Sequence, residues 1–414
     1  MITPRILAIV LAGGEGTRLA PLTAERSKPA VPFAGRYRIV DFVLSNLVNS
    51  HIHSIYLLVQ YKSQSLIEHI RRSWMLSPMF PEQFITVVPP QMRGGPEWFQ
   101  GTADAVYQNI NLIEHYAPDI VAIFGADHIY RMDIRQMVDF HRAQSAEVSV
   151  AALPVPASVA QSFGVIEAEA DGRIRAFLEK PANPPSMPGR PGYSFASMGN
   201  YLFDAEVLVD ALTEAARQGH KDFGRDLLPR LCTRRHVHAY DFTSNHIPGL
   251  HPGEQPGYWR DVGTLDAYFD AHFDLLGMEP RFNLFNPSWR IGSSNYQGPT
   301  PKIVRAEMDN CILGAGCLIK GAKIRNSILR REIVIEEDVE LDECIVMDYS
   351  VIRRGARLRR VIVDRYNDIP PNSRIGFDAV ADAARYHRSD SGIVVIAKRN
   401  HKDGGAAGEP PRYL

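Results

Sequence analysis

The C-terminal third of the chain places an aliphatic residue at every sixth position, and few folds can satisfy such a spacing. One register contains Ile333, Val339, Ile345, Val351, Val363, Ile369 and Ile375, and only Arg357 interrupts it. A second register holds Ile328, Val334, Val346, Ile352 and Leu358 and is broken by Glu340, while Ile312, Leu318 and Ile324 repeat the period in a shifted phase. This period fits neither an α-helix nor simple strand alternation. It is typical of a β-helix, in which each flat side of a coil stacks one aliphatic residue on the next coil.

The preceding part of the chain, up to about residue 280, alternates short apolar runs with longer segments of helical periodicity. The runs Ile6–Leu11, Ile55–Val59, Ile120–Phe124 and Val148–Leu153 predict buried parallel strands, and Ser63–Trp74 and Ala103–His115 predict helices. Alternation of this kind favours a doubly wound α/β domain, in which ligands bind beyond the carboxyl ends of the strands. The proline-rich stretch 181–192 predicts a loop.

These patterns divide the 414 residues into four parts. We expect an α/β domain over residues 1–280, a linker over 281–302, a β-helix over 303–385, and a cap with a loose tail over 386–414.

The charge balance restricts the partners that such a chain can bind. Forty-six basic residues face 47 acidic ones, for a net charge of −1, so bulk attraction to nucleic acid or to a membrane surface is not expected. The four cysteines show no CxxC spacing, and no stretch approaches the roughly 20 apolar residues of a membrane helix. We therefore expect a soluble, cytoplasmic protein with free thiols and with neither nucleic-acid nor membrane partners.

A glycine-rich segment, LAGGEGTRLAPLTAERSKP at residues 11–29, directly follows the first apolar run. A Rossmann fingerprint would need a third glycine where Leu19 stands, and a Walker loop would need a Gly-Lys-Ser/Thr triplet that is absent here. Glycines nevertheless let backbone N–H groups approach an anion, and Arg18 and Lys28 add two cations. The segment therefore predicts a phosphate-binding loop of neither common pattern.

Carboxylates follow two other strands of the α/β domain. Asp127 lies just past the apolar run 120–124, and Mg²⁺ in phosphate chemistry prefers one or two carboxylates, for which Asp261 in YWRDVGT is the candidate partner. Each aspartate alone is more often a helix cap or a salt-bridge partner, and their separation in sequence does not show that they meet. Glu179 and Lys180, at the end of the alternating strand 174–179, predict either a phosphorylated-polyol site or a solvated charge pair.

Eight strings occur in an order that resembles one known family. They are LAGGEGTRL…SKPAVPF, YRIVDFVLSN, WFQGTADA, FGADHIYRMD, FGVI, FLEKP, SMGNY and YWRDVGT, followed by the hexapeptide β-helix. Over nearly its whole length the chain resembles the sugar-1-phosphate nucleotidyltransferases, and within them the bacterial glucose-1-phosphate adenylyltransferases. The resemblance implies a doubly wound, mostly parallel, Rossmann-like sheet followed by a left-handed parallel β-helix.

The resemblance also assigns roles to residues of this sequence. Arg18, Lys28 and Asp127 would be catalytic, with Lys28 stabilising the transferring phosphoryl group and the pyrophosphate, and Asp127 and Asp261 would hold Mg²⁺. The ATP site would comprise Gly13, Gly14, Gly16, Arg18, Gln91, Gly101 and Thr102, with Gln91 reading the adenine. The glucose 1-phosphate site would comprise Phe99, Gly164, Glu179, Lys180 and Ser197.

The implied activity is the formation of ADP-glucose and diphosphate from ATP and glucose 1-phosphate, which feeds glycogen-type α-1,4-glucan synthesis. The implied enzyme is a homotetramer under the control of small-molecule metabolites. Three alternatives stay open from the residues: a mannose-1-phosphate guanylyltransferase, an N-acetylglucosamine-1-phosphate uridylyltransferase, and a non-catalytic regulatory subunit.

Two positions depart from the family pattern. Phe99 stands where relatives often have tyrosine, so its role would be packing alone. Glu25 stands where relatives have a basic residue, although Arg26, Arg38 and Arg388 could still form an anion site between the domains. The arginine cluster of residues 353, 354, 357, 359 and 360 predicts an exposed β-helix face or a subunit contact.

Overall fold

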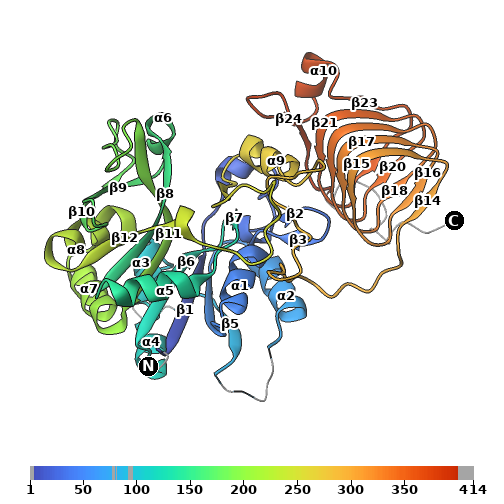
Figure 1. The fold of residues 1–414 in the computed structure, drawn as a ribbon. Coiled ribbons are helices and arrows are strands. Elements are labelled where there is room, and N and C mark those ends of the chain that lie inside the picture. The colour runs from blue at the N-terminus through green and yellow to red at the C-terminus, as the bar shows by residue number, and fades with distance from the viewer. Residues whose placement is uncertain (1–3, 77–79, 81, 92–96, 400–414) are drawn as a thin grey trace.

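A sheet-based domain and a β-helix lie side by side in the computed structural model, with helix α9 (Leu265–Phe273) between them (Figure 1). The structure describes residues 4–76, 80, 82–91 and 97–399. The last 15 residues, which belong to the expected loose tail, lie outside the described residues. The two parts correspond to the two hydrophobic patterns of the sequence. The alternation of strand and helix segments is buried in the sheet domain, and the six-residue period is buried in the β-helix.

The central sheet runs in the order β10-β9-β11-β6-β1-β4-β5, and β8 and β12 continue it from β11. The strands β1, β4, β5 and β6 are parallel, whereas β11 runs antiparallel to β6, β8 and β9. The sheet is therefore mixed, and it keeps the α/β class expected from the sequence. The bounds are β1 Ile6–Ala12, β4 Ser54–Val59, β5 Phe84–Val88, β6 Ile120–Gly125, β8 Val148–Pro156, β9 Gly164–Ala168, β10 Ile174–Glu179, β11 Tyr193–Asp204 and β12 Val237–Asp241.

Both faces of this sheet are covered, which explains why its strands read as continuous apolar runs. In β1, Leu7 and Ile9 belong to one apolar cluster, and Ala8 and Val10 belong to the cluster on the opposite face. The main covering helices are α1 (Val40–Asn49), α2 (Gln64–Ser73), α5 (Ile134–Ala143), α7 (Ala205–Arg217) and α8 (Leu228–Arg234).

The expected helix over 103–115 is two short helices, α3 (Thr102–Tyr107) and α4 (Ile110–Tyr116). The chain breaks at Asn109, whose side-chain amide donates a hydrogen bond to the carbonyl of Ala105. An asparagine competes for backbone carbonyls in this way, and hydrophobic periodicity alone does not reveal the interruption.

The β-helix stacks its aliphatic residues in columns. Ile319 pairs with Ile335, Ile335 with Ile352, and Ile352 with Ile369, and all four are at most 3% exposed. The coils form two sheets of parallel strands, β14 Lys302–Val304, β16 Leu318–Lys320, β18 Val334–Ile335, β20 Val351–Ile352 and β22 Asp368–Ile369 in one, and β15 Glu307–Leu313, β17 Lys323–Leu329, β19 Glu340–Val346 and β21 Arg357–Val363 in the other, to which an antiparallel β24 (His387–Arg388) is added at the C-terminal end. This arrangement is consistent with the β-helix expected from the six-residue period and with its left-handed parallel form, which the family resemblance implies.

The C-terminal end of the β-helix is covered by further elements. β23 (Arg374–Ile375) and β25 (Val394–Ile396) pair with β21, β24 (His387–Arg388) pairs with β25, and α10 (Ala379–Ala383) precedes them.

The arginine cluster of the β-helix is paired with acidic residues of neighbouring coils. Arg357 lies 3.5 Å from Glu340 and Arg360 lies 3.0 Å from Glu343, while Arg354 contacts Glu337. These side chains are substantially exposed, so each pair contributes at most about 1 kcal/mol. The arginines therefore form an exposed face of ion pairs, as one of the two expected interpretations had it.

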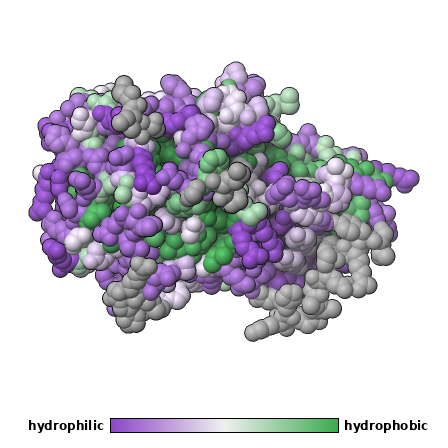
Figure 2. Space-filling view, turned by 90° about the horizontal axis from the view of Figure 1, so that it is seen from below, coloured by the Kyte–Doolittle hydropathy of each residue, from purple (hydrophilic) through white to green (hydrophobic). Residues whose placement is uncertain are grey.

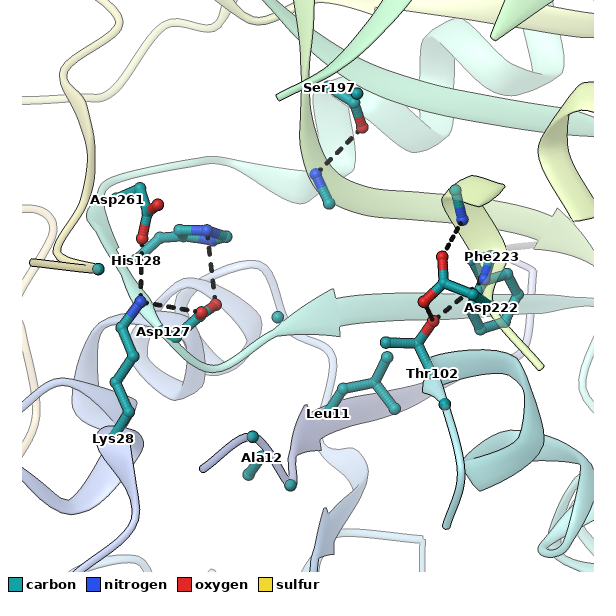
Figure 3. A pocket seen from close by; sticks show the side chains of 18 of the residues that line it. Leu11, Ala12, Lys28, Thr102, Asp127, His128, Ser197, Asp222, Phe223 and Asp261 are labelled. Atoms are coloured by element: carbon teal, nitrogen blue, oxygen red, sulfur yellow. Dashed lines mark hydrogen bonds and ion pairs between the residues drawn. The ribbon is translucent and has the colours of Figure 1, made fainter. Parts of the chain in front are cut away.

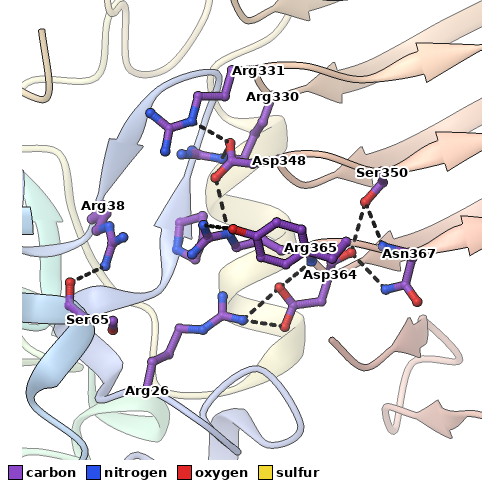
Figure 4. Close-up of polar contacts among 12 residues, drawn as sticks. Arg26, Arg38, Ser65, Arg330, Arg331, Asp348, Ser350, Asp364, Arg365 and Asn367 are labelled. Carbon is purple, nitrogen blue, oxygen red and sulfur yellow. Dashed lines mark hydrogen bonds and ion pairs between the residues drawn. The ribbon is translucent and has the colours of Figure 1, made fainter. Parts of the chain in front are cut away.

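The two domains share a buried interface. One apolar cluster contains Phe33 and Tyr268 from the sheet domain together with Ile328 and Ile345 from the β-helix. The buried Arg330 donates hydrogen bonds to Asp348 and to the carbonyls of Phe33, Ala34 and Tyr37. A second ion pair joins Arg26 to Asp364 at 2.7 Å, and both of its side chains are almost inaccessible to solvent (Figure 4).

His272 of α9 lies at this interface and makes it sensitive to acid. Its Nε2 accepts a hydrogen bond from the backbone N–H of Ala34, and burial lowers the pKa of His272 to about 3. The folded protein therefore excludes a proton that the unfolded chain binds below about pH 6.5. Stability contributed by the neutral ring is present above that pH and is lost as the pH falls from 6.5 towards 3.

We expect a His272→Gln variant to be less stable at pH 8 but to depend less steeply on pH. The wild type should lose up to about 1.4 kcal/mol more per pH unit than the variant on acidification below pH 6. Urea unfolding at pH values between 8 and 5 measures both slopes. If the free energies of unfolding of the two proteins fell equally steeply with pH, His272 would not be the source of the acid sensitivity.

The surface is mostly polar on the face shown in Figure 2, and hydrophobic residues gather towards the middle of that face. Among the described residues, none of the helices is both long enough and apolar enough to cross a bilayer.

Candidate active site

A cleft of about 820 Å³ opens at the carboxyl ends of β1 and β6 and receives most of the side chains that the sequence singled out. Its lining includes Gly13, Gly14, Gly16, Arg18, Lys28, Phe99, Gly101, Thr102, Asp127, Gly164, Glu179, Lys180, Ser197 and Asp261. Gln91 does not line this cleft; its exposed side-chain amide donates to the carbonyl of Pro89. The proposed contact of Gln91 with adenine therefore stays a prediction.

The glycine loop leaves β1 after Ala12 and enters a short 3₁₀ turn at Thr17–Leu19. Gly16 has a φ of 66°, and a Cβ atom there would lie 2.9 Å from the Cβ of Lys28, so only glycine fits. A Cβ on Gly14 would meet nothing within 4 Å, which leaves open space above that part of the loop. The glycine loop therefore packs at Gly16 against the base of the Lys28 side chain, and the other side of the loop, at Gly14, is open for a ligand.

Lys28 joins the two aspartates whose partnership the sequence left open. Its Nζ lies 3.0 Å from Oδ2 of Asp127 and 2.9 Å from Oδ1 of Asp261 (Figure 3). Asp127 follows β6, whereas Asp261 ends β13 (Trp259–Asp261), which pairs with β7 (His128–Tyr130) so that Asp261 lies opposite His128. An antiparallel pair of short strands therefore brings together carboxylates that are far apart in sequence.

Lys28 and Asp127 hold each other in their charged forms. Burial alone would lower the pKa of Lys28, but Asp127 and Asp261 outweigh it, and the pKa is raised above its ordinary value. Burial would raise the pKa of Asp127, but the neighbouring His128 and Lys28 depress it well below its usual range. At neutral pH the cluster consists of an ammonium group between two carboxylates.

The same carboxylates could also hold a metal ion. Donor atoms of Asp127, His128 and Asp261 all lie within 4.8 Å of one another. Two carboxylates that converge on one point suit a hard divalent ion such as Mg²⁺. The donor set therefore fits the metal that nucleotide chemistry calls for.

The opposite wall of the cleft carries the residues assigned to the sugar phosphate. In the β9–β10 ladder Gly164 lies directly opposite Glu179, and a Cβ on Gly164 would lie 2.5 Å from the Phe177 ring. Nζ of Lys180 lies 3.4 Å from Glu179, and the lysine side chain is 63% exposed, so this ammonium can turn to a ligand. Ser197 of β11 accepts a hydrogen bond from the N–H of Gly199 (Figure 3).

Three further residues shape the cleft although the sequence analysis did not select them. Gln60 exchanges hydrogen bonds with the backbone of Phe99 through its side-chain amide. Asp222 accepts a hydrogen bond from the Thr102 hydroxyl at 3.0 Å and also from the backbone of Gly224 and Arg225. An aspartate before a helical segment, as in KDFGRD, is a capping signal that could have identified Asp222. His128, which packs on Trp259, offered only its position beside Asp127.

The three arginines assigned to an effector site are not equivalent. Arg26 is bound to Asp364, and Arg38 donates to the carbonyl of Ser65 (Figure 4). Burial, followed by the charge of Arg365, lowers the pKa of Arg38 to about 9. Arg388 of β24 donates to the carbonyl of Ala379.

Comparison with known proteins agrees with this architecture. The family model described as "Nucleotidyl transferase" matches residues 7–277, and a model described as "GlmU-like, C-terminal hexapeptide" matches residues 300–396.

Curated relatives match along almost their whole length. A protein of Thermodesulfovibrio yellowstonii is 56% identical over 95% of this chain and 96% of its own. A protein of Corynebacterium jeikeium is 47% identical over 95% and 98%, and one of Aliivibrio fischeri is 45% identical over 95% and 98%. All three carry the name glucose-1-phosphate adenylyltransferase. The chain therefore belongs to the nucleotidyl transferase family, on the branch whose curated members bear that name.

Proposed function

We propose that this protein is a glucose-1-phosphate adenylyltransferase, which converts ATP and glucose 1-phosphate to ADP-glucose and diphosphate. The observation that carries the proposal is the cluster of Lys28, Asp127 and Asp261 beside the glycine loop, in a cleft whose far wall holds Glu179 and Lys180. The names of relatives that match over nearly the whole chain support the choice of substrates.

The reaction needs positioning and charge screening more than proton transfer. A phosphate oxygen of glucose 1-phosphate attacks the α-phosphorus of ATP in line and expels diphosphate, and because this nucleophile is already anionic no general base is required. Arg18 and the backbone of Gly13, Gly14 and Gly16 bind the triphosphate, and Lys28 stabilises the charge that develops on the leaving diphosphate. Glu179 accepts hydrogen bonds from sugar hydroxyls, and Lys180 binds the sugar phosphate.

Asp127 and Asp261 would hold the Mg²⁺ ion. When bound, this ion would neutralise phosphate charge and orient the phosphate oxygens. The two carboxylates would fix its place at the edge of the glycine loop, where Lys28 also lies.

The proposal is tested by the release of diphosphate from the purified protein. We expect turnover with ATP and glucose 1-phosphate to exceed that with GTP and mannose 1-phosphate, or with UTP and N-acetylglucosamine 1-phosphate, by a factor of about 100 or more. A preference for either other pair would replace this proposal with one of the alternative transferases. An inactive protein that activates an added catalytic subunit would indicate a regulatory subunit.

We further propose a cytoplasmic homotetramer that serves glycogen-type α-1,4-glucan synthesis and responds to small anionic metabolites. Burial is the main cause of the lowered pKa of Arg38, and the charges of Arg365 and Arg330 add to it, so several cations lie close together between the domains, which supports an anion site there. Glu25 contacts Lys398 and adds a carboxylate near that site. Initial rates with and without a panel of phosphorylated and carboxylated metabolites test the response, and sedimentation tests the tetramer.

A further inference from the structure

The position of Lys28 between two carboxylates has a consequence for the binding of metal. Its Nζ lies between the carboxylates at 3.0 Å from Asp127 and 2.9 Å from Asp261, and its side chain is 9% exposed. An ammonium group in this position uses oxygen lone pairs that a divalent ion would need at about 2.1 Å. It also places a positive charge within a few ångströms of the ion. The ammonium and the metal therefore compete for the same pair of carboxylates.

We propose that Lys28 acts as a built-in counter-ion that keeps the Asp127–Asp261 pair closed to divalent metal until a nucleotide draws its ammonium group away. The inference rests on the proposed function in taking these carboxylates as the metal site. It adds a positioning role for Lys28 before the reaction begins, distinct from any role in stabilising the diphosphate.

The surroundings of Lys28 allow this exchange. Lys28 begins a short 3₁₀ turn, Lys28–Ala30. A Cβ atom on Gly16 would lie 2.9 Å from the Cβ of Lys28, so the lysine side chain begins directly beside the glycine loop. Its flexible four-carbon chain can carry Nζ from the aspartates towards phosphates held by that loop. Phosphate oxygens then replace the carboxylates as its partners, and the aspartates become free to bind metal. Metal and nucleotide would consequently enter the site cooperatively.

The test measures the binding of Mn²⁺ alone, as a spectroscopic probe for the divalent site, to the full chain without nucleotide. Electron paramagnetic resonance of the free ion gives the dissociation constant. We expect the Lys28→Met variant to bind Mn²⁺ at least about tenfold more tightly than the wild type, because the competing charge is gone. Lys28→Arg, which keeps the charge, should bind no more tightly than the wild type. Near-ultraviolet circular dichroism confirms that each variant is folded.

Lys180→Met provides a matched control, because it removes one positive charge from the same cleft while Lys180 contacts Glu179 and not the aspartates. We expect its Mn²⁺ affinity to stay within about twofold of the wild type. The proposal is overturned if Lys28→Met binds Mn²⁺ no more tightly than the wild type or if Lys28→Arg gains as much as Lys28→Met. An equal gain in Lys180→Met, or no saturable binding by any variant, would also overturn it. Since the experiment uses neither ATP nor sugar phosphate, its result is independent of the substrate assay.

Discussion

Replacing Asp127 by asparagine is expected to lower kcat by about 10²–10³-fold, because the change removes one of the two carboxylates that would hold Mg²⁺ beside the reacting phosphates. Asparagine keeps the shape of the side chain but leaves Lys28 with a single ionised partner, Asp261. Steady-state formation of ADP-glucose at saturating substrates measures the loss. The change should appear in kcat more than in the KM for glucose 1-phosphate, since Glu179 and Lys180, to which we assign that substrate, lie on the opposite wall of the cleft.

Asp171→Asn is the matched control for this variant. Asp171 lies on the exposed turn between β9 and β10, where it accepts a hydrogen bond from the N–H of Arg173. Its replacement should leave kcat within about twofold of the wild type, as for a surface change away from the site. An Asp127→Asn enzyme with wild-type turnover would show that catalysis does not need the Asp127 carboxylate.

Replacing Arg330 by alanine should give the largest loss of stability. Its guanidinium group binds Asp348 at 2.8 Å and three carbonyls of the loop at Phe33–Tyr37, and the residue is 3% exposed. The variant leaves a buried carboxylate and buried carbonyls without their main partner, which costs about 3–5 kcal/mol. Burial would raise the pKa of Asp348, but Arg330, followed by Arg365 and Arg331, lowers it to about 2, so the variant removes the main counter-charge of a buried carboxylate. Urea unfolding at pH 7.5 measures the free-energy difference.

Arg354→Ala is the control, because Arg354 pairs with Glu337 on the exposed face of the same β-helix. Its loss should cost no more than about 1 kcal/mol. Equal stability losses in the two variants would mean that Arg330 does not hold the domains together.

Much of the fold follows directly from hydrophobic periodicity. The six-residue period predicts stacked coils, and Ile333, Val339 and Ile345 are fully buried in them. The apolar runs that begin at Ile6 and Ile120 form the neighbouring parallel strands β1 and β6. Both faces of these strands are covered, which is why their sequences are continuously apolar. The break between α3 and α4 could not be predicted from periodicity. The Asn109 side chain bonds a backbone carbonyl of the helix and divides it, although the apolar pattern of residues 103–115 predicts one continuous helix. The domain limits at residues 280, 302 and 385 stay a prediction.

The sequence by itself determined the two architectures and the glycine loop after β1, because these depend on residue period and on glycines that have no substitute, such as Gly16. It also placed Asp127 and Asp261 among the candidates, but only the tertiary structure decided that they meet, through the β7–β13 pair and the ammonium group of Lys28. Likewise, the sequence offered Arg26 as part of an anion site between the domains, and the structure pairs it with Asp364 of the β-helix. The physical reason is the same in both cases: burial and charge pairing depend on neighbours that are distant along the chain, and no local spacing encodes them.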